Sequence, residues 1–134
     1  MTTGGSPAVI PTLRYADANA AIEWLGKAFG FTPTMVIPGD GDTVAHAELV
    51  YGNGVVMLGS TTDGADGRLP YEQGPSAVYL VVDDVPAAWD AATQAGAEVV
   101  EALAEKEYGG QGFTILDPER NIWSVGSYSP TLAR

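Results

Sequence analysis

The sequence contains no cysteine, so the chain can form neither a disulfide framework nor a thiolate metal site. Zinc ribbons, iron–sulfur clusters and cysteine nucleophiles are therefore excluded. Long apolar runs are also absent, since no stretch approaches the roughly 20 apolar residues that a membrane-spanning helix needs. The first residues, MTTGGSP, do not have the basic and apolar parts of a secretory signal, so a cytoplasmic protein is expected.

Basic residues are scarce: 6 Lys and Arg stand against 17 Asp and Glu, for a formal net charge of −11. Such a field repels phosphate backbones and anionic lipids, so neither nucleic acid nor a membrane is an expected partner. A neutral or cationic small molecule fits the field better, although an acidic surface also serves solubility alone. The length of 134 residues with 46% hydrophobic content predicts one globular domain, residues 1–134.

One pattern of residues recurs after 67 positions, which is half the chain length. LRYADANAAIEWLGKA, starting at Leu13, aligns with LVVDDVPAAWDAATQA, starting at Leu80. The same shift aligns GVVMLGS, from Gly54, with NIWSVGS, from Asn121. Because two distant blocks share one shift, we infer an internal repeat.

Each half has the pattern of a strand, a helix and three further strands. Asp17 and Asp84 are predicted N-caps of helices that end at Gly30 and Gly96. The sequence therefore predicts an α+β fold of two tandem βαβββ modules, residues 8–60 and 77–128, joined by a Gly- and Pro-rich linker at 61–76. A helix is expected on one face of each mixed sheet, which leaves the other face free to curve into a cup. The strands are expected at residues 8–15, 34–38, 44–51, 54–59, 77–82, 98–102, 112–116 and 121–126.

Four segments make the chain resemble the vicinal oxygen chelate (VOC) superfamily, of the glyoxalase/bleomycin resistance protein/dioxygenase type. They are RYADANAAIEWLGKAFGF, HAELVYGNGVVMLGS, VYLVVDDVPAAWDAATQAGAEV and LDPERNIWSVGS. The resemblance covers nearly all of the chain after Ser6 and implies the glyoxalase/bleomycin resistance fold. Arg120 stands where the last segment usually has glycine, so the turn at residues 119 and 120 is one place where the chain could depart from the family.

The resemblance also indicates where a metal would be held. Metal-dependent members of the superfamily take one ligand from the first strand of each module and one from the last, which corresponds here to Ile10, Met57, Ala77 and Ser124. Isoleucine and alanine offer no lone pair, a thioether is a soft ligand and a serine hydroxyl a weak one. The resemblance thus implies a member that lacks the usual metal and uses no cofactor.

Alternation along the strands predicts which side chains reach the free faces. A two-residue turn at Gly52 and Asn53 would place Glu48 opposite Met57 and His46 opposite Gly59. Trp123 is expected beneath a helix. The residues expected on the free faces are Thr12, Arg14, His46, Glu48, Val55, Met57, Tyr79, Val81, Phe113, Ile115, Ile122 and Ser124.

From these we select the candidate site residues. His46 and Glu48 are candidates for a catalytic acid–base pair or for two ligands of a displaced metal site. The alternatives are a structural role for His46, a plain Arg14–Glu48 ion pair, and an interface-filling role for Tyr79 and Phe113. The predicted ligand-binding residues are Arg14, His46, Glu48, Met57, Tyr79, Phe113, Ser124 and, in a glycine-rich loop, Tyr108.

An apolar lining with few polar groups is typical of a small-molecule site. The sequence thus favours a homodimeric, metal-independent binding protein for an aromatic or cationic metabolite or antibiotic, with a role in antibiotic resistance. The alternative is a lyase, isomerase or dioxygenase of the same superfamily that uses His46 and Glu48 directly or in a relocated metal site.

Overall fold

A computed structural model describes residues 7–61, 74–107 and 109–130, in two compact units divided after Pro75. Most of the predicted linker, residues 62–73, and the loop residue Tyr108 lie outside the described residues. No helix of the described chain is long and apolar enough to cross a membrane. Each unit is taken by itself below.

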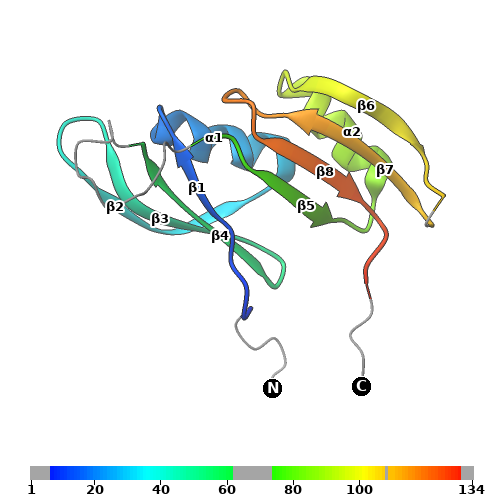
Figure 1. The fold of residues 1–134 in the computed structure, drawn as a ribbon, viewed down its shortest axis with the longest axis horizontal. Helices are drawn as coiled ribbons and strands as arrows, with labels where there is room; N and C mark the ends of the chain where they lie inside the picture. Colours follow the sequence, from blue (N-terminus) through cyan, green and yellow to red (C-terminus); the bar gives the residue numbers. More distant parts are fainter. Residues whose placement is uncertain (1–6, 62–73, 108, 131–134) are drawn as a thin grey trace. The chain divides into compact units, whose positions relative to one another are not determined.

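The first unit is a four-stranded sheet with one helix (Figure 1). Its elements are β1 (Thr12–Tyr15), α1 (Ala18–Phe29), β2 (Thr32–Pro38), β3 (Val44–Tyr51) and β4 (Gly54–Ser60). The strands lie in the order β1-β4-β3-β2, with β1 parallel to β4 and the other pairs antiparallel. The helix packs against β1, β3 and β4, so one face of the sheet is covered.

The second unit repeats this plan (Figure 1). Its elements are β5 (Ala77–Val81), α2 (Val85–Gln94), β6 (Glu98–Glu105), β7 (Gln111–Leu116) and β8 (Ile122–Gly126). The order is β5-β8-β7-β6, again with a single parallel pair, β5 with β8. The predicted pair of βαβββ modules with mixed sheets is confirmed.

Both helices begin and end where the sequence predicts. The carboxylate of Asp17 accepts a hydrogen bond from the amide of Ala20, and that of Asp84 from the amide of Ala87, each at 3.0 Å. Gly30 and Gly96 both have φ of 86°, a left-handed conformation that glycine adopts without steric cost. The repeated Asp and Gly therefore mark the same helix boundaries in each unit.

The first strand is shorter than predicted, since β1 begins at Thr12 rather than near residue 8. Pro11 has no amide hydrogen, and only its carbonyl joins the sheet, by accepting from the amide of Met57 at 3.0 Å. Ile10 consequently lies before the strand and has no partner in the β1–β4 ladder.

The turn between β7 and β8 is built around a buried carboxylate. Asp117, 4% exposed, accepts hydrogen bonds from the amides of Glu119 and Asn121 at 2.9 and 3.0 Å. It also accepts from the side-chain amide of Asn121 at 3.0 Å and from the indole N–H of Trp123 at 3.1 Å. Trp123 is fully buried on the side of the sheet that packs against α2, as predicted. The Asp-Pro segment thus ties the turn to the core.

Arg120 in this turn has φ of +70°, the left-handed region that L-residues other than glycine rarely adopt. We expect Arg120→Gly to raise the free energy of unfolding by about 1 kcal/mol, because the substitution removes this steric cost. The lost ion pair with Glu98, 3.5 Å long between two exposed side chains, offsets little of the gain. Urea denaturation of both proteins measures the difference, and an unchanged or lowered stability would show that the strain is not there.

Candidate functional site

The face of the first sheet that α1 does not cover, here called the first free face, carries the best-connected polar group of the candidate site. The predicted two-residue turn is present, with Tyr51 paired to Gly54 and Glu48 to Met57. In the parallel β1–β4 pair, Thr12 lies beside Met57 and Arg14 beside Gly59. Residues paired across strands share a face, so the first free face comprises Thr12, Arg14, Met35, Ile37, His46, Glu48 and Met57.

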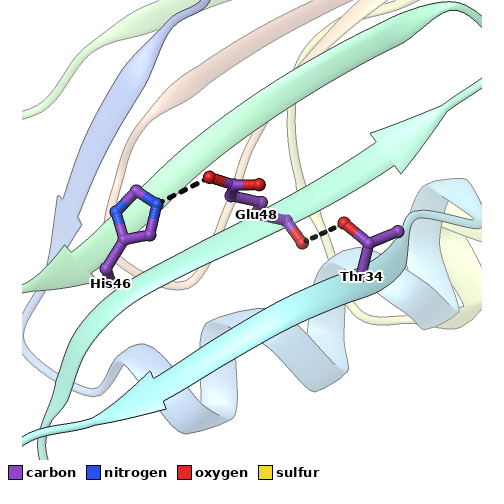
Figure 2. A network of polar contacts seen from close by, with 3 residues as sticks. All are labelled: Thr34, His46 and Glu48. Atoms are coloured by element: carbon purple, nitrogen blue, oxygen red, sulfur yellow. Dashed lines mark hydrogen bonds and ion pairs between the residues drawn. The ribbon is translucent and has the colours of Figure 1, made fainter.

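His46 and Glu48 point toward one another from the same strand, with His46 Nε2 2.9 Å from Glu48 Oε2 (Figure 2). Their side chains are 37% and 34% exposed, so the pair is within reach of a ligand in solvent. A carboxylate bonded to one imidazole nitrogen fixes the ring and leaves the other nitrogen, Nδ1, for a different partner. The geometry is that of a general acid–base pair or of a polar anchor.

Two irregularities in the β2–β3 ladder position this pair. The register shifts at Thr34, whose hydroxyl donates to the carbonyl of Glu48 at 3.3 Å (Figure 2), and again at Ala45, between the pairs Ile37–His46 and Pro38–Val44. A bulge turns the neighbouring side chains relative to a regular strand. As a result Met35 lies beside Glu48 and Ile37 beside His46, and both apolar side chains are nearly half exposed.

Met35 and Ile37 are site residues that the sequence did not reveal. A strand was expected at residues 34–38, but alternation alone does not show which of its side chains lie on the free face unless the position of the bulge is known. The regular β3–β4 ladder also ends at the pair Ala47–Leu58, so the expected pairing of His46 with Gly59 does not occur. Gly59 instead lies close to the backbone carbonyl of Ala45, the bulge residue, which a Cβ at position 59 would contact.

Arg14 lies on the first free face as predicted, but it does not pair with Glu48. The carboxylate of Glu48 is bonded to His46, and the guanidinium of Arg14 lies over Gly59, where a Cβ would collide with Nη1. The alternative of a plain Arg14–Glu48 ion pair is therefore not what the structure contains. Glycine at position 59 is what allows the long arginine side chain to lie flat across β4.

The uncovered face of the second sheet, the second free face, carries a row of hydroxyl groups flanked by the exposed side chains of Val81 and Ile122. Tyr79 lies beside Ser124, and Ser124 beside Thr114, whose hydroxyl is 3.2 Å from that of Ser124. The Tyr79 hydroxyl donates to the carbonyl of Tyr128 at 2.7 Å. Tyr79 and Ser124 thus occupy the predicted face, and Thr114 is a further polar neighbour that was not predicted.

The expected orientation of Phe113 is wrong. Its side chain is 1% exposed and packs edge-on against Trp89 of α2, with ring centroids 5.2 Å apart. Ile115, fully buried, faces the same way. Phe113 pairs with Val125 and Thr114 with Ser124, so it is Thr114 that shares the free face with Ser124. Phe113 is therefore a core residue on the face of the sheet that α2 covers.

A one-residue difference between the units explains this error. The β3–β4 turn has two residues, whereas the β7–β8 turn, closed by the bond from the Asp117 amide to the Asn121 carbonyl, has three, residues 118–120. Because side chains alternate with a period of two, an odd turn reverses the faces relative to an even one. Glu48 and Thr114, which pair with Met57 and Ser124 at equivalent positions of the two units, are therefore 66 residues apart rather than 67.

The shift of 67 is recovered at the far end of these strands. The Ser60 hydroxyl accepts from the amide of Val44 at 2.8 Å, and the Ser127 hydroxyl accepts from the amide of Gln111 at 3.2 Å. The bulge at Ala45 supplies the additional residue in the first unit. The repeated Gly-Ser sequence thus fixes equivalent strand ends, and His46 lies in the stretch between them that differs.

The four positions that correspond to metal ligands in the superfamily do not fit a metal ion. Ile10 and Ala77 have no donor atom, Met57 offers only a thioether, and the hydroxyl of Ser124 is shared with Thr114. Among the described residues, no three His, Cys, Asp or Glu side chains form a group that could hold a metal ion. His46 and Glu48 supply two donors, and Tyr108 lies outside the described residues.

Sequence comparison identifies related proteins over most of the chain. The sequence model of the Glyoxalase/Bleomycin resistance protein/Dioxygenase superfamily matches residues 9–125. The uncharacterized protein Mb0911c of Mycobacterium bovis is 33% identical over 131 residues, which cover 94% of this chain and 86% of the relative. The uncharacterized protein Rv0887c of Mycobacterium tuberculosis is also 33% identical, over 94% of this chain and 77% of its own length.

Solved structures resemble the chain at similar coverage. TioX from Micromonospora sp. ML1 superposes with a TM-score of 0.80 at 27% sequence identity, over 92% of this chain and 100% of TioX. A lactoylglutathione lyase from Agrobacterium tumefaciens superposes with a TM-score of 0.66 at 19% identity, over 91% of this chain and 93% of the lyase. At that identity the second likeness concerns the fold alone.

Proposed function

We propose that this chain, which belongs to the Glyoxalase/Bleomycin resistance protein/Dioxygenase superfamily, binds an aromatic or cationic small molecule without a metal ion. The observation that carries the proposal is the composition of the first free face. A His46–Glu48 pair stands beside the exposed side chains of Met35 and Ile37, with Met57 opposite Glu48. Thioether and aliphatic side chains offer polarizable surface for an aromatic ring, and the polar pair orients it.

The acidic charge of the chain supports the cationic part of the proposal. A net charge of −11 raises the local concentration of cations, and Glu48 is a carboxylate on the ligand-facing side. We propose further that the protein is a cytoplasmic homodimer that sequesters a metabolite or an antibiotic. Light scattering would test the dimer, which requires twice the 13.9 kDa mass of one chain.

The binding proposal is tested by calorimetry with a panel of cationic and neutral aromatic natural products. Saturable binding of a panel member, with chemical-shift changes at His46 and Met57, would support it. Parallel elemental analysis of protein purified without chelators would measure bound metal. Stoichiometric transition metal, or turnover of substrates without saturable ligand retention, would contradict a metal-independent binding protein.

Glu48→Gln should weaken binding of berberine, a cationic aromatic probe, by about tenfold, because a charged contact at a partly exposed site is lost. Glu23→Gln removes the same charge from α1, away from the free face, and should leave the affinity unchanged. Calorimetric titration of the three proteins gives the comparison. Equal weakening by both substitutions would indicate a general effect of net charge rather than a contact with Glu48.

The second candidate function is an enzyme of the same superfamily, a lyase or isomerase. The 2.9 Å contact between His46 and Glu48 favours it, since a general base oriented by a carboxylate has this geometry. In that case His46→Gln should lower kcat by about 100-fold or more, whereas a binding protein would lose affinity alone.

A further inference from the structure

The basic side chains of the described residues differ in their partners. Three of the four, Lys27, Lys106 and Arg120, each make an ion pair with a glutamate, at 3.2, 3.2 and 3.5 Å. The side chain of Arg14 makes no hydrogen bond or ion pair with another side chain or backbone group in residues 7–61, 74–107 or 109–130. Among the basic residues that the structure describes in this strongly acidic chain, Arg14 is therefore the exception.

The position of Arg14 keeps its charge available. The residue is half-buried on the first free face, and its guanidinium lies over Gly59, where the missing side chain leaves room. The nearest free-face carboxylate in the ladder, Glu48, is already bonded to His46. On this face the hydrogen-bonded His46–Glu48 pair and the Arg14 guanidinium are therefore separate groups.

Arg14 is half-buried, and its guanidinium gains no acceptor from the described residues in return for the hydration that the side chain loses. Its planar fork of N–H groups matches the two oxygens of a carboxylate, and such charge-assisted pairs are stronger than neutral hydrogen bonds. The same face carries the apolar side chains of Met57, Met35 and Ile37. A ligand that satisfies both features has an aromatic or aliphatic body and a carboxylate at one end.

We propose that the ligand of this protein carries a carboxylate and that Arg14 binds it through the guanidinium. The proposal rests on small-molecule binding at the first free face, and it narrows the ligand to an aromatic acid, including an acid that also carries a cationic group. The acidic field of the chain disfavours anions elsewhere on its surface, so recognition of a carboxylate depends on the Arg14 guanidinium.

The test compares three probes that separate the two features: 2-naphthoate, its uncharged amide 2-naphthamide, and acetate. Binding to the full chain is measured by calorimetry, and the Nε–H signal of Arg14 is followed in ¹⁵N-labelled protein. We expect 2-naphthoate to bind about tenfold more tightly than 2-naphthamide, and to shift the Arg14 signal, since only the acid forms the charged pair. Acetate should shift the same signal at higher concentration.

Variants identify the residue. Arg14→Met should reduce the affinity for 2-naphthoate about tenfold, to that of 2-naphthamide, and leave 2-naphthamide binding unchanged. Arg14→Lys keeps the charge but loses the planar fork of N–H groups, so its affinity for 2-naphthoate should lie between those of the parent protein and Arg14→Met. Lys27→Met makes the same change of charge on α1 and should have no effect. Thermal melting of each variant checks that it is folded.

The outcomes are distinct. Equal affinity for 2-naphthoate and 2-naphthamide, or an unchanged preference in a folded Arg14→Met protein, would overturn the carboxylate proposal while small-molecule binding still holds. Absence of binding by both naphthalene compounds would also overturn it for aromatic acids. Small-molecule binding itself would then be decided by the natural-product panel, whose members do not depend on Arg14.

Discussion

Replacing Asp117 with alanine is expected to lower the free energy of unfolding by about 3–5 kcal/mol, the largest effect of any single substitution considered for this chain. The carboxylate is 4% exposed and accepts from four N–H groups, one of which belongs to the fully buried Trp123. Without it, the indole and the Asn121 amide would be buried without acceptors, each at a cost of about 1–3 kcal/mol.

Two further variants make this measurement specific. Asp117→Asn keeps the shape and one carbonyl oxygen but turns an amide group toward other donors, so an intermediate loss is expected. Asp90→Ala removes an exposed carboxylate from α2 of the same unit and should change stability by less than about 0.5 kcal/mol. Urea denaturation followed by tryptophan fluorescence compares all four proteins. A loss of less than about 1 kcal/mol for Asp117→Ala would show that water replaces the carboxylate.

Replacing Gly126 with alanine is expected to cost about 2 kcal/mol. A Cβ at this position would lie 2.8 Å from the Tyr79 hydroxyl and 2.9 Å from the carbonyl of Gln111. The tyrosine could move aside, at the cost of its bond to the Tyr128 carbonyl, but the Gln111 carbonyl belongs to the neighbouring strand. The backbone must therefore shift to admit the methyl group.

Gly74→Ala is the matched control, because nothing lies within 4 Å of a Cβ built there. Its stability should stay within about 0.5 kcal/mol of the parent protein, or rise slightly as the unfolded chain loses freedom. Denaturant midpoints and slopes of the three proteins provide the comparison. If Gly126→Ala were as stable as Gly74→Ala, the close approach of Tyr79 and Gln111 over position 126 would be excluded.

Much of the fold follows from short-range chemistry that can be predicted. Asp17 and Asp84 cap helices because their carboxylates reach an amide three residues on, and Gly30 ends one because it accepts a positive φ. The repeat then supplies the order of elements in both units. What the sequence did not reveal was the start of β1, where Pro11 removes a donor from the ladder.

The positions of candidate side chains were predicted correctly where a two-residue turn determines the strand register. The two-residue turn at Gly52 and Asn53 places Glu48 opposite Met57, as expected. Phe113 was misplaced because a three-residue turn reverses the alternation, and Met35 was missed because a bulge at Thr34 does the same. A bulge or an odd turn adds one residue between paired positions and so reverses the face of the side chains beyond it. The hydrophobic pattern of a short strand does not reveal this additional residue.

The bulge at Ala45 shows how two copies of the same βαβββ unit come to present different side chains on their free faces. Serine hydroxyls hold the strand ends at Val44 and Gln111 in both units, so an extra residue between the end and the turn is absorbed locally. The first unit has such an additional residue next to its His46–Glu48 pair, while its helix cap matches that of the second unit. Divergence between duplicated units can therefore proceed by chain length as well as by substitution, and replacing β7 with the sequence of β3 would bring both the additional residue and the His46–Glu48 pair into the second unit.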